Sequence, residues 1–407
     1  MAERPLDRVI YHTNRSGKLP LELHLDDVGC TQDDASIVQD IVLVAGARIQ
    51  SLDFTMTSPE ILHFHRLVFE HILSGISPSD FKTLRISCEV SLPDAFITGY
   101  DSGPWLAFET GNAPHSDLGP NILRWKQGII NSGFSGVTNL HLQGVFFNWS
   151  STLYHGLVDL RLTAPPIGKA TDIHISTLKY ILSKCPGLRT FQFSLHLITN
   201  EVDDEPSLQR PSDPVSLPDL EMIRVSTAHA YIGGRPSFYV GSLLRLFAPG
   251  SKPLRLILET GRNPNEPLFE SNGMKEFLVR SKVERLCIRN GHPSINEMRL
   301  CHLPDLKHLA FDSCHRISAP TSPNWSLGLQ SLFVNATTLG QEDVRSMVEL
   351  CPNGLTLSMC KICPTHVDEK QAQSVPELDL QAMFPAVRFT MNERLWCNLI
   401  ARWSNLD

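Results

Sequence analysis

The chain has 407 residues, more than the roughly 250–300 at which a single compact core usually stops growing. Its formal net charge of −7 argues against a general affinity for nucleic acid or anionic membranes. No apolar run approaches the ~20 residues of a membrane-spanning helix, and the first residues lack the apolar segment of a secretory signal. With its ten scattered cysteines, the composition therefore favours an intracellular protein, cytoplasmic or nuclear, that keeps its thiols reduced.

The N-terminal part alternates short strands with amphipathic helices. Residues 19–25 alternate apolar and polar side chains and predict a half-buried strand. A helix is expected to begin at Asp33–Asp34 and to bury three residues, Ile37, Ile41 and Val44. A second helix is predicted from Ser58 to Gly75. Each of these helices is followed by a predicted short strand, at residues 49–54 and 81–86. Both strands have an apolar residue, two variable residues, an apolar residue, one variable residue and an apolar residue.

Residues 92–120 are rich in glycine and proline and predict a long excursion, followed by a helix at 122–130. Beyond residue 136 a repeated pattern becomes regular: an apolar residue, two variable ones, an apolar one, one variable and an apolar one. The middle apolar residues are Leu140, Leu160, Phe191, Ile223, Leu256, Leu286, Leu309, Leu332 and Leu355. Their last three spacings are each 23 residues. Such a period is typical of leucine-rich repeats.

The connections in this region predict helices and two surface loops. Apolar residues at helical spacing, including Leu178 and Val344, predict one helix that ends at Cys185-Pro186 and one that ends at Cys351-Pro352. Residues 199–218 and 261–267 are expected to be mobile surface loops. Near the C-terminus we expect one more strand around Val387 and Phe389. A final helix beginning at Asn392 is expected to align Leu395, Leu399 and Trp403.

These elements predict an α/β fold of the leucine-rich-repeat type. We expect a solenoid, an open curved sheet of short parallel strands with helices or loops on its convex side. Its predicted parts are irregular N-terminal repeats (1–135), a regular repeat region (136–364) and a C-terminal capping unit (365–407). The alternative is a closed βα barrel or a doubly wound sheet, since those folds also alternate strands and helices.

Several stretches are similar to known families. Residues 178–193 resemble the helix, Cys-Pro and strand unit of cysteine-containing leucine-rich repeats. Residues 15–25, 140–151 and 156–162 are similar to the large family of fungal F-box-like proteins. This resemblance implies the recognition arm of a ubiquitin-ligase adaptor. It applies to the repeat region, because no F-box with its Leu-Pro-Pro-Glu-like start is found before Arg15. A Skp1-like adaptor as partner is implied by the family alone.

Catalytic and metal-binding motifs were also sought. The sequence has no Gly-x-Ser-x-Gly elbow, no His-Glu-x-x-His and no Gly-x-Gly-x-x-Gly, and residues 163–170 lack the first glycine and the final hydroxyl residue of a phosphate-binding loop. Cys360, Cys363 and His366 have spacing that can begin a zinc site, with Cys351 upstream, but a second ligand pair is missing. We therefore predict no catalytic residue, no cofactor and no metal.

The strand pattern also predicts a binding surface. If the apolar anchors face the core, the residue between the last two of each strand faces the opposite, concave side. This outward row consists of Asp53, Arg85, His141, Arg161, Gln192, Arg224, Cys287, Ala310 and Phe333. Arginine and aromatic residues are enriched in binding hot spots. The expected partner is an acidic or phosphorylated protein segment that contacts Arg85, His141, Arg161, Gln192 and Arg224, with Phe333 as an apolar contact.

Two functions follow from this reading. The first is a non-catalytic protein-recognition scaffold that serves as the substrate-recognition part of an F-box-type ubiquitin-ligase adaptor. The second is an α/β enzyme with an active site at the strand ends, which would require a nucleophile and a base that converge in one pocket. A partner-capture experiment distinguishes them.

Overall fold

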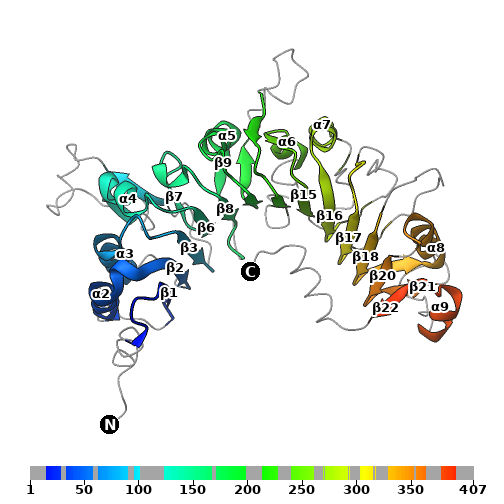
Figure 1. The fold of residues 1–407 in the computed structure, drawn as a ribbon, viewed down its shortest axis with the longest axis horizontal. Helices are drawn as coiled ribbons and strands as arrows, with labels where there is room; N and C mark the ends of the chain where they lie inside the picture. The colour runs from blue at the N-terminus through cyan, green and yellow to red at the C-terminus, as the bar shows by residue number, and fades with distance from the viewer. Residues whose placement is uncertain are drawn as a thin grey trace, which may run out of the picture. The chain divides into compact units, whose positions relative to one another are not determined.

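The fold is described from a computed structural model of the chain (Figure 1). The structure describes residues 15–28, 34–57, 63–89, 96–100, 123–166, 171–198, 213–227, 240–260, 269, 271–291, 293, 303–314, 317, 329–352, 354–363 and 377–390. The chain divides into two compact units, residues 1–188 and 189–407. Both have a mixed α/β composition and are built on open parallel sheet.

The main sheet of the first unit contains five parallel strands whose order follows the chain. These are β1 (Leu21–Asp26), β2 (Ile49–Met56), β3 (Thr83–Cys88), β6 (Asn139–Gln143) and β8 (Asp159–Thr163). The helices are α2 (Asp34–Ala45), α3 (His63–Gly75), α4 (Gln127–Gly133) and α5 (Ile175–Ser183). A small second sheet joins β4 (Phe96–Tyr100) to β5 (Leu123–Lys126) and β7 (Phe146–Phe147), and β9 (Asp172–His174) precedes α5. The helices α2 and α3 lie beside one another on one side of the main sheet (Figure 1).

The second unit repeats this plan. Its main strands are β10 (Thr190–Phe193), β13 (Met222–Ser226), β15 (Leu254–Glu259), β16 (Val283–Arg289), β17 (His308–Asp312), β18 (Ser331–Asn335), β20 (Leu355–Ser358) and β22 (Arg388–Thr390). The helices are α6 (Val240–Leu244), α7 (Asn272–Arg280), α8 (Gln341–Leu350) and α9 (Glu377–Met383). Short strand pairs join β12 (Val215–Leu217) to β14 (Phe247–Pro249), and β19 (Thr338–Gly340) to β21 (Lys361–Cys363), while β11 (His196–Ile198) follows β10. The strand order never reverses within a unit, unlike that of a doubly wound sheet.

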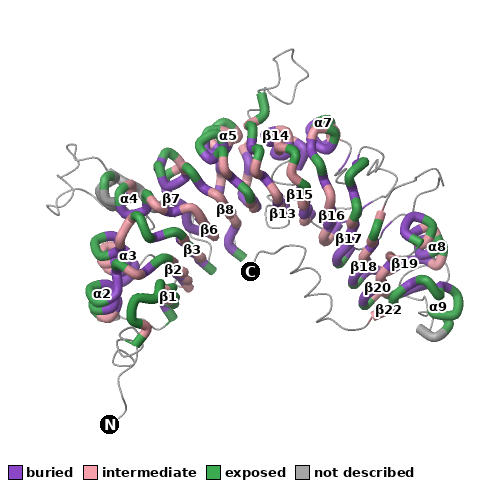
Figure 2. Tube along the Cα trace, viewed as in Figure 1, coloured by how far each residue is buried: buried purple, intermediate pink, exposed green. Residues whose placement is uncertain are grey.

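The predicted apolar anchors form the core. Leu140 pairs with Leu160 in the first unit, and in the second the anchors from Phe191 to Leu355 pair strand by strand in one continuous register. All of them are buried, with exposed fractions of 0–1%. Buried residues run through the strands, whereas the outer turns of the helices are exposed (Figure 2). The predicted register is therefore confirmed within each unit.

A turn of one conformation ends four successive strands. Asn290, Ser313, Ala336 and Met359 follow β16, β17, β18 and β20 and have φ values of 60°, 54°, 47° and 51°. They are 23 residues apart, and each backbone N–H donates to a carbonyl of the next strand at 2.9–3.1 Å. The left-handed conformation costs a residue with a Cβ roughly 1–2 kcal/mol. The repeat period is thus fixed by backbone geometry as well as by leucine spacing.

Ala336→Gly should raise the free energy of unfolding by about 0.5–1 kcal/mol, because glycine adopts positive φ without the Cβ clash. Part of the gain is offset by the greater freedom of glycine in the unfolded chain. Urea denaturation measures the change. Ala310→Gly in β17 is the matched control and should lower stability by about 0.5–1 kcal/mol. Equal losses in the two variants would contradict the turn conformation.

Three predicted elements differ from the structure. The buried face of α2 is formed by Ala35, Val38, Ile41, Val42 and Ala45, whereas Val44 is 50% exposed. Apolar residues lie on nearly every side of this helix, so the sequence pattern is compatible with several buried faces. Packing against the rest of the unit decides which face is buried. The helix expected at 122–130 is instead β5 followed by α4, because β5 pairs with the distant β4. Residues 215–217 of the expected loop at 199–218 form β12.

Other expectations have mixed outcomes. The helix predicted to end at Gly75 does so and buries Phe64, Val68 and Ile72. The helices before the two Cys-Pro pairs are α5 and α8, and the last expected strand is β22. Other predictions lie outside the described residues. They are the predicted helix start at Ser58, the loops at 199–212 and 261–267, and the C-terminal helix from Asn392.

Candidate functional site

Four residues of the predicted outward row lie in register in the first unit. Asp53 pairs with Arg85, Arg85 with His141, and His141 with Arg161, on strands β2, β3, β6 and β8. His24 of β1 extends the row, because it pairs with Asp53. The neighbours of the last four along their strands are buried, and those of His24 are half-buried, so these five side chains share the face opposite the core.

In the second unit the row runs from Gln192 to Arg388. Its members are Gln192, Arg224, Ile257, Cys287, Ala310, Phe333, Thr356 and Arg388, each paired with the next. Ile257 was not among the predicted residues, because the run Leu256-Ile-Leu258 is apolar throughout and shows no alternation. His24, Thr356 and Arg388 were not predicted either. A systematic extension of the strand pattern into the first and last strands was the signal that could have found these three.

Arg161 and His141 share one carboxylate. The Arg161 guanidinium donates to Asp159 in a bidentate arrangement, from Nη2 to Oδ2 at 2.8 Å and from Nε to Oδ1 at 3.1 Å. His141 Nε2 lies 3.1 Å from Asp159 Oδ2. Burial lowers the pKa of His141, and Asp159 opposes this change only in part. Burial by itself would raise the pKa of Asp159, but the adjacent His141 and the hydrogen bonds from Arg161 lower it overall. The charge of Arg161 is therefore neutralised within the unit.

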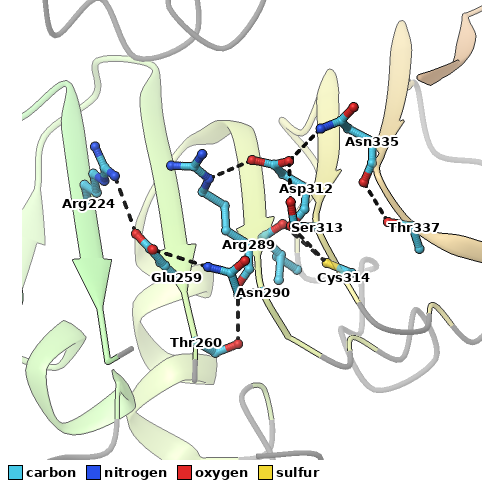
Figure 3. A network of polar contacts seen from close by, with 11 residues as sticks. Arg224, Glu259, Thr260, Arg289, Asn290, Asp312, Ser313, Cys314, Asn335 and Thr337 are labelled. Carbon is cyan, nitrogen blue, oxygen red and sulfur yellow. Dashed lines mark hydrogen bonds and ion pairs between the residues drawn. The ribbon is translucent and has the colours of Figure 1, made fainter. Parts of the chain in front are cut away.

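Arg224 belongs to a polar network on the second unit, drawn in Figure 3. Its Nη2 lies 3.5 Å from Glu259 Oε2, and Asn290 Nδ2 donates to the other oxygen of Glu259 at 3.3 Å. Further along, Asp312 accepts hydrogen bonds from Arg289 Nε and from Asn335 Nδ2, both at 2.9 Å. The two arginines of this network, like Arg161, are thus paired with acidic side chains.

Arg85 differs from these arginines. Its side chain is exposed, and it makes no ion pair with any residue that the structure describes. Its neighbours in the row are Asp53, whose side chain lies 3.6 Å from His24, and His141. Among the predicted contact residues, Arg85 therefore offers a guanidinium group that is in no ion pair with a described residue. Arg161 and Arg224 are in ion pairs, and they offer a partner only those N–H groups that their carboxylates leave free.

The middle of the second row is apolar. Ile257, Cys287 and Ala310 form a buried cluster on the outward face, and the partly buried Phe333 packs against it. Burial raises the pKa of the Cys287 thiol far above its usual range, so this cysteine acts as a small apolar residue rather than as a nucleophile. The row therefore changes from charged and polar at Gln192 and Arg224 to apolar at Phe333.

Comparisons with known proteins assign no function. No protein-family model matches the sequence, and no curated protein matches it. Among the helices that the structure describes, none has the length and apolar character needed to cross a membrane.

The cysteines considered for a metal site have other contacts. Cys360 Sγ lies 3.3 Å from the carbonyl oxygens of Val334 and Ser358, and burial raises its pKa to about 11. Cys363 is buried in β21, Cys351 is buried at the end of α8, and His366 lies outside the described residues. The described part of the chain holds no group of three or more His, Cys, Asp or Glu side chains that could bind a metal ion.

A buried histidine and carboxylate lie in the first unit. His65 of α3 and Asp27, directly after β1, are 2.9 Å apart, and their side chains are 0% and 1% exposed. The pair also contacts the rings of Phe54 and Phe64 through His65. Burial lowers the pKa of His65 despite the neighbouring Asp27. With no surface access, this pair joins α3 to the sheet rather than offering a base to a substrate.

Proposed function

We propose that this chain is a leucine-rich-repeat solenoid that binds a protein segment on the outward face of its sheet and catalyses no reaction. The observation that carries this proposal is the in-register row of outward side chains in each unit. Because register places the residues of each row at regular intervals of about 4.8 Å, one extended partner segment can contact several residues of the same row.

Three structural features support the solenoid form. The strands of each unit follow one another in chain order, and the 23-residue period of the leucines recurs in the left-handed turns. In the second unit, α7 and α8 lie on one side of the main strands (Figure 1). Each repeat then contacts its immediate neighbours, which is the arrangement that allows a long chain to extend one continuous core.

The surface chemistry supports a protein partner. Nucleic acid is disfavoured by the net charge of −7 and by the carboxylates beside Arg161 and Arg224. A row that combines guanidinium groups with an apolar patch around Phe333 resembles the mixture of arginine and aromatic anchors in protein interfaces. The partner that fits is an acidic or phosphorylated segment with apolar residues nearby.

The link to ubiquitin-dependent turnover is a proposal from family resemblance. The stretches at 15–25, 140–151 and 156–162 support it, and they contribute β1, β6 and β8 of the sheet. In this role the sheet surface selects a substrate, and a Skp1-like adaptor connects it to a ligase. The structure describes no feature that favours a specific enzymatic reaction.

The test is capture of partners by the tagged full chain from a fungal extract, with quantification by mass spectrometry. Arg85→Glu should reduce recovery of the main partner at least about tenfold, since reversing an interfacial charge commonly costs more than 1.4 kcal/mol. Arg66→Glu on α3 is the matched control, because this exposed arginine lies on the helical side of the same unit. It should leave recovery unchanged.

The same capture experiment tests the adaptor role and the location of the recognition surface. Co-purification of Skp1-like and cullin subunits would support the adaptor role, and their absence would remove it. If recovery persists in Arg85→Glu and is lost when residues 201–211 are replaced by a short Gly-Ser linker, the proposed row is not the recognition surface.

A further inference from the structure

Two arginines on the outward face of the second unit form no ion pair with an acidic side chain in the part of the chain that the structure describes. Arg255 of β15 and Arg285 of β16 are paired in register, so their backbones lie in adjacent strands about 4.8 Å apart. Both are half-buried, and neither makes a hydrogen bond or an ion pair with any residue that the structure describes. By contrast, Arg224 and Arg289 on the same face are paired with Glu259 and Asp312.

Arg255 and Arg285 line a half-open pocket of about 300 Å³, together with Glu221, Lys252, Pro253 and Glu284. The charges at its rim are already paired. Lys252 Nζ lies 2.9 Å from Asp219 Oδ1 and 3.1 Å from Glu221 Oε1. Lys307 Nζ lies 3.2 Å from Glu284 Oε2. Arg255 and Arg285 form no such ion pair with a residue that the structure describes, and Glu221 and Glu284 offset the charge of Arg255 only from a distance.

This arrangement destabilises the free protein. Like charges directly opposite one another on neighbouring strands repel. Burial lowers the pKa of Arg255 and the charge of Arg285 lowers it further, while Glu221 and Glu284 oppose these effects only in part. Arg285 also pairs in register with His308, whose pKa is lowered by burial and then by Arg285. An anion bound between the guanidinium groups would remove this repulsion.

We propose that Arg255 and Arg285 form a binding site for a phosphate monoester group on a partner protein segment. A phosphate monoester carries about −1.5 to −2 charges near neutral pH, which matches two guanidinium groups better than a single carboxylate does. The planar guanidinium fork also fits the spacing of phosphate oxygens. Because Glu221 and Glu284 flank the pocket, it accepts one dianionic group and repels a continuous polyanion.

The neighbouring surface indicates what surrounds the phosphate. Ile257 and Cys287 follow Arg255 and Arg285 by two positions on the same strands, and so lie on the same face. With Ala310 and Phe333 they form the apolar part of the outward row. The ligand is therefore a phosphorylated residue with apolar residues close by in the segment. This assignment rests on the proposed recognition function and specifies its ligand.

The site is tested by thermal unfolding of the full chain with O-phospho-L-serine, with inorganic phosphate, and with L-serine at matched ionic strength. Both phosphate compounds should raise the Tm of the wild type in a saturable manner, and L-serine should not. Arg285→Gln should weaken binding of O-phospho-L-serine about tenfold or more, since it removes charge-assisted hydrogen bonds. Without ligand its Tm should equal or exceed that of the wild type, because the repulsion with Arg255 is gone.

Arg345→Gln is the matched control. This arginine lies on α8 beside Glu342, and the variant should keep the full ligand response. The proposal is overturned if O-phospho-L-serine has no more effect than L-serine, or if Arg285→Gln retains the wild-type affinity. Equal shifts in all variants would reflect the general stabilisation that phosphate salts produce and would likewise overturn it. Each of these failures leaves the Arg85 capture experiment to decide the recognition function independently.

Discussion

Leu309→Ala should lower the free energy of unfolding of the second unit by about 2–5 kcal/mol. Leu309 is 0% exposed and lies in register between Leu286 and Leu332, which are also fully buried. Removing its side chain leaves a cavity that the rigid strands on both sides cannot close. Chemical denaturation followed by circular dichroism measures the loss.

A surface leucine provides the matched control for this change. Leu43 on α2 is 75% exposed, so Leu43→Ala should alter stability by no more than about 0.5 kcal/mol. If Leu309→Ala were as mild as Leu43→Ala, Leu309 would not face the core and the strand register would be wrong.

Asp27→Ala should lower the free energy of unfolding of the first unit by roughly 3 kcal/mol or more. The carboxylate accepts hydrogen bonds from the Thr57 backbone N–H at 2.7 Å and from the Thr57 hydroxyl, and it lies 2.9 Å from His65 Nε2. Removing it leaves the buried His65 imidazole and the part-buried N–H and hydroxyl of Thr57 without this partner, and each buried polar group left in this way costs about 1–3 kcal/mol.

The neighbouring Asp26 serves as the control, because it is exposed on the outward face. Asp26→Ala should change stability by about 0.5 kcal/mol. Equal losses for the two variants would mean that the His65–Asp27 contact contributes little. Loss of hydrogen-exchange protection in α3 in the Asp27→Ala variant would support the role of this contact in joining α3 to β1.

The strands and their register could be predicted because the information is local. A strand of this type needs only an apolar residue at alternate positions. The repeated pattern around Leu140, Leu286 and Leu332 meets this need with residues close together in the sequence. The same alternation placed Arg85, His141 and Arg161 in one row. Helix ends at Gly75 and before the Cys-Pro pairs were predictable for the same reason, since capping and proline act within one turn.

Other features depended on residues far apart in the chain. The buried face of α2 was decided by packing, because its apolar residues surround the helix. The pairing of β5 with β4 turned a predicted helical start into a strand. The buried contact between His65 and Asp27 joins residues that no local pattern connects.

The charges of the outward face show the same division. By itself the sequence determined which side chains face outward, because strand alternation is a local property. Only the tertiary structure decided which of them are neutralised. Asp159 forms an ion pair with Arg161, and Glu259 forms one with Arg224. In contrast, Arg85 in the first unit and the adjacent pair Arg255 and Arg285 in the second form no ion pair with a described residue. An ion pair between adjacent strands depends on which residues the register sets side by side, and their separation along the sequence carries no sign of it.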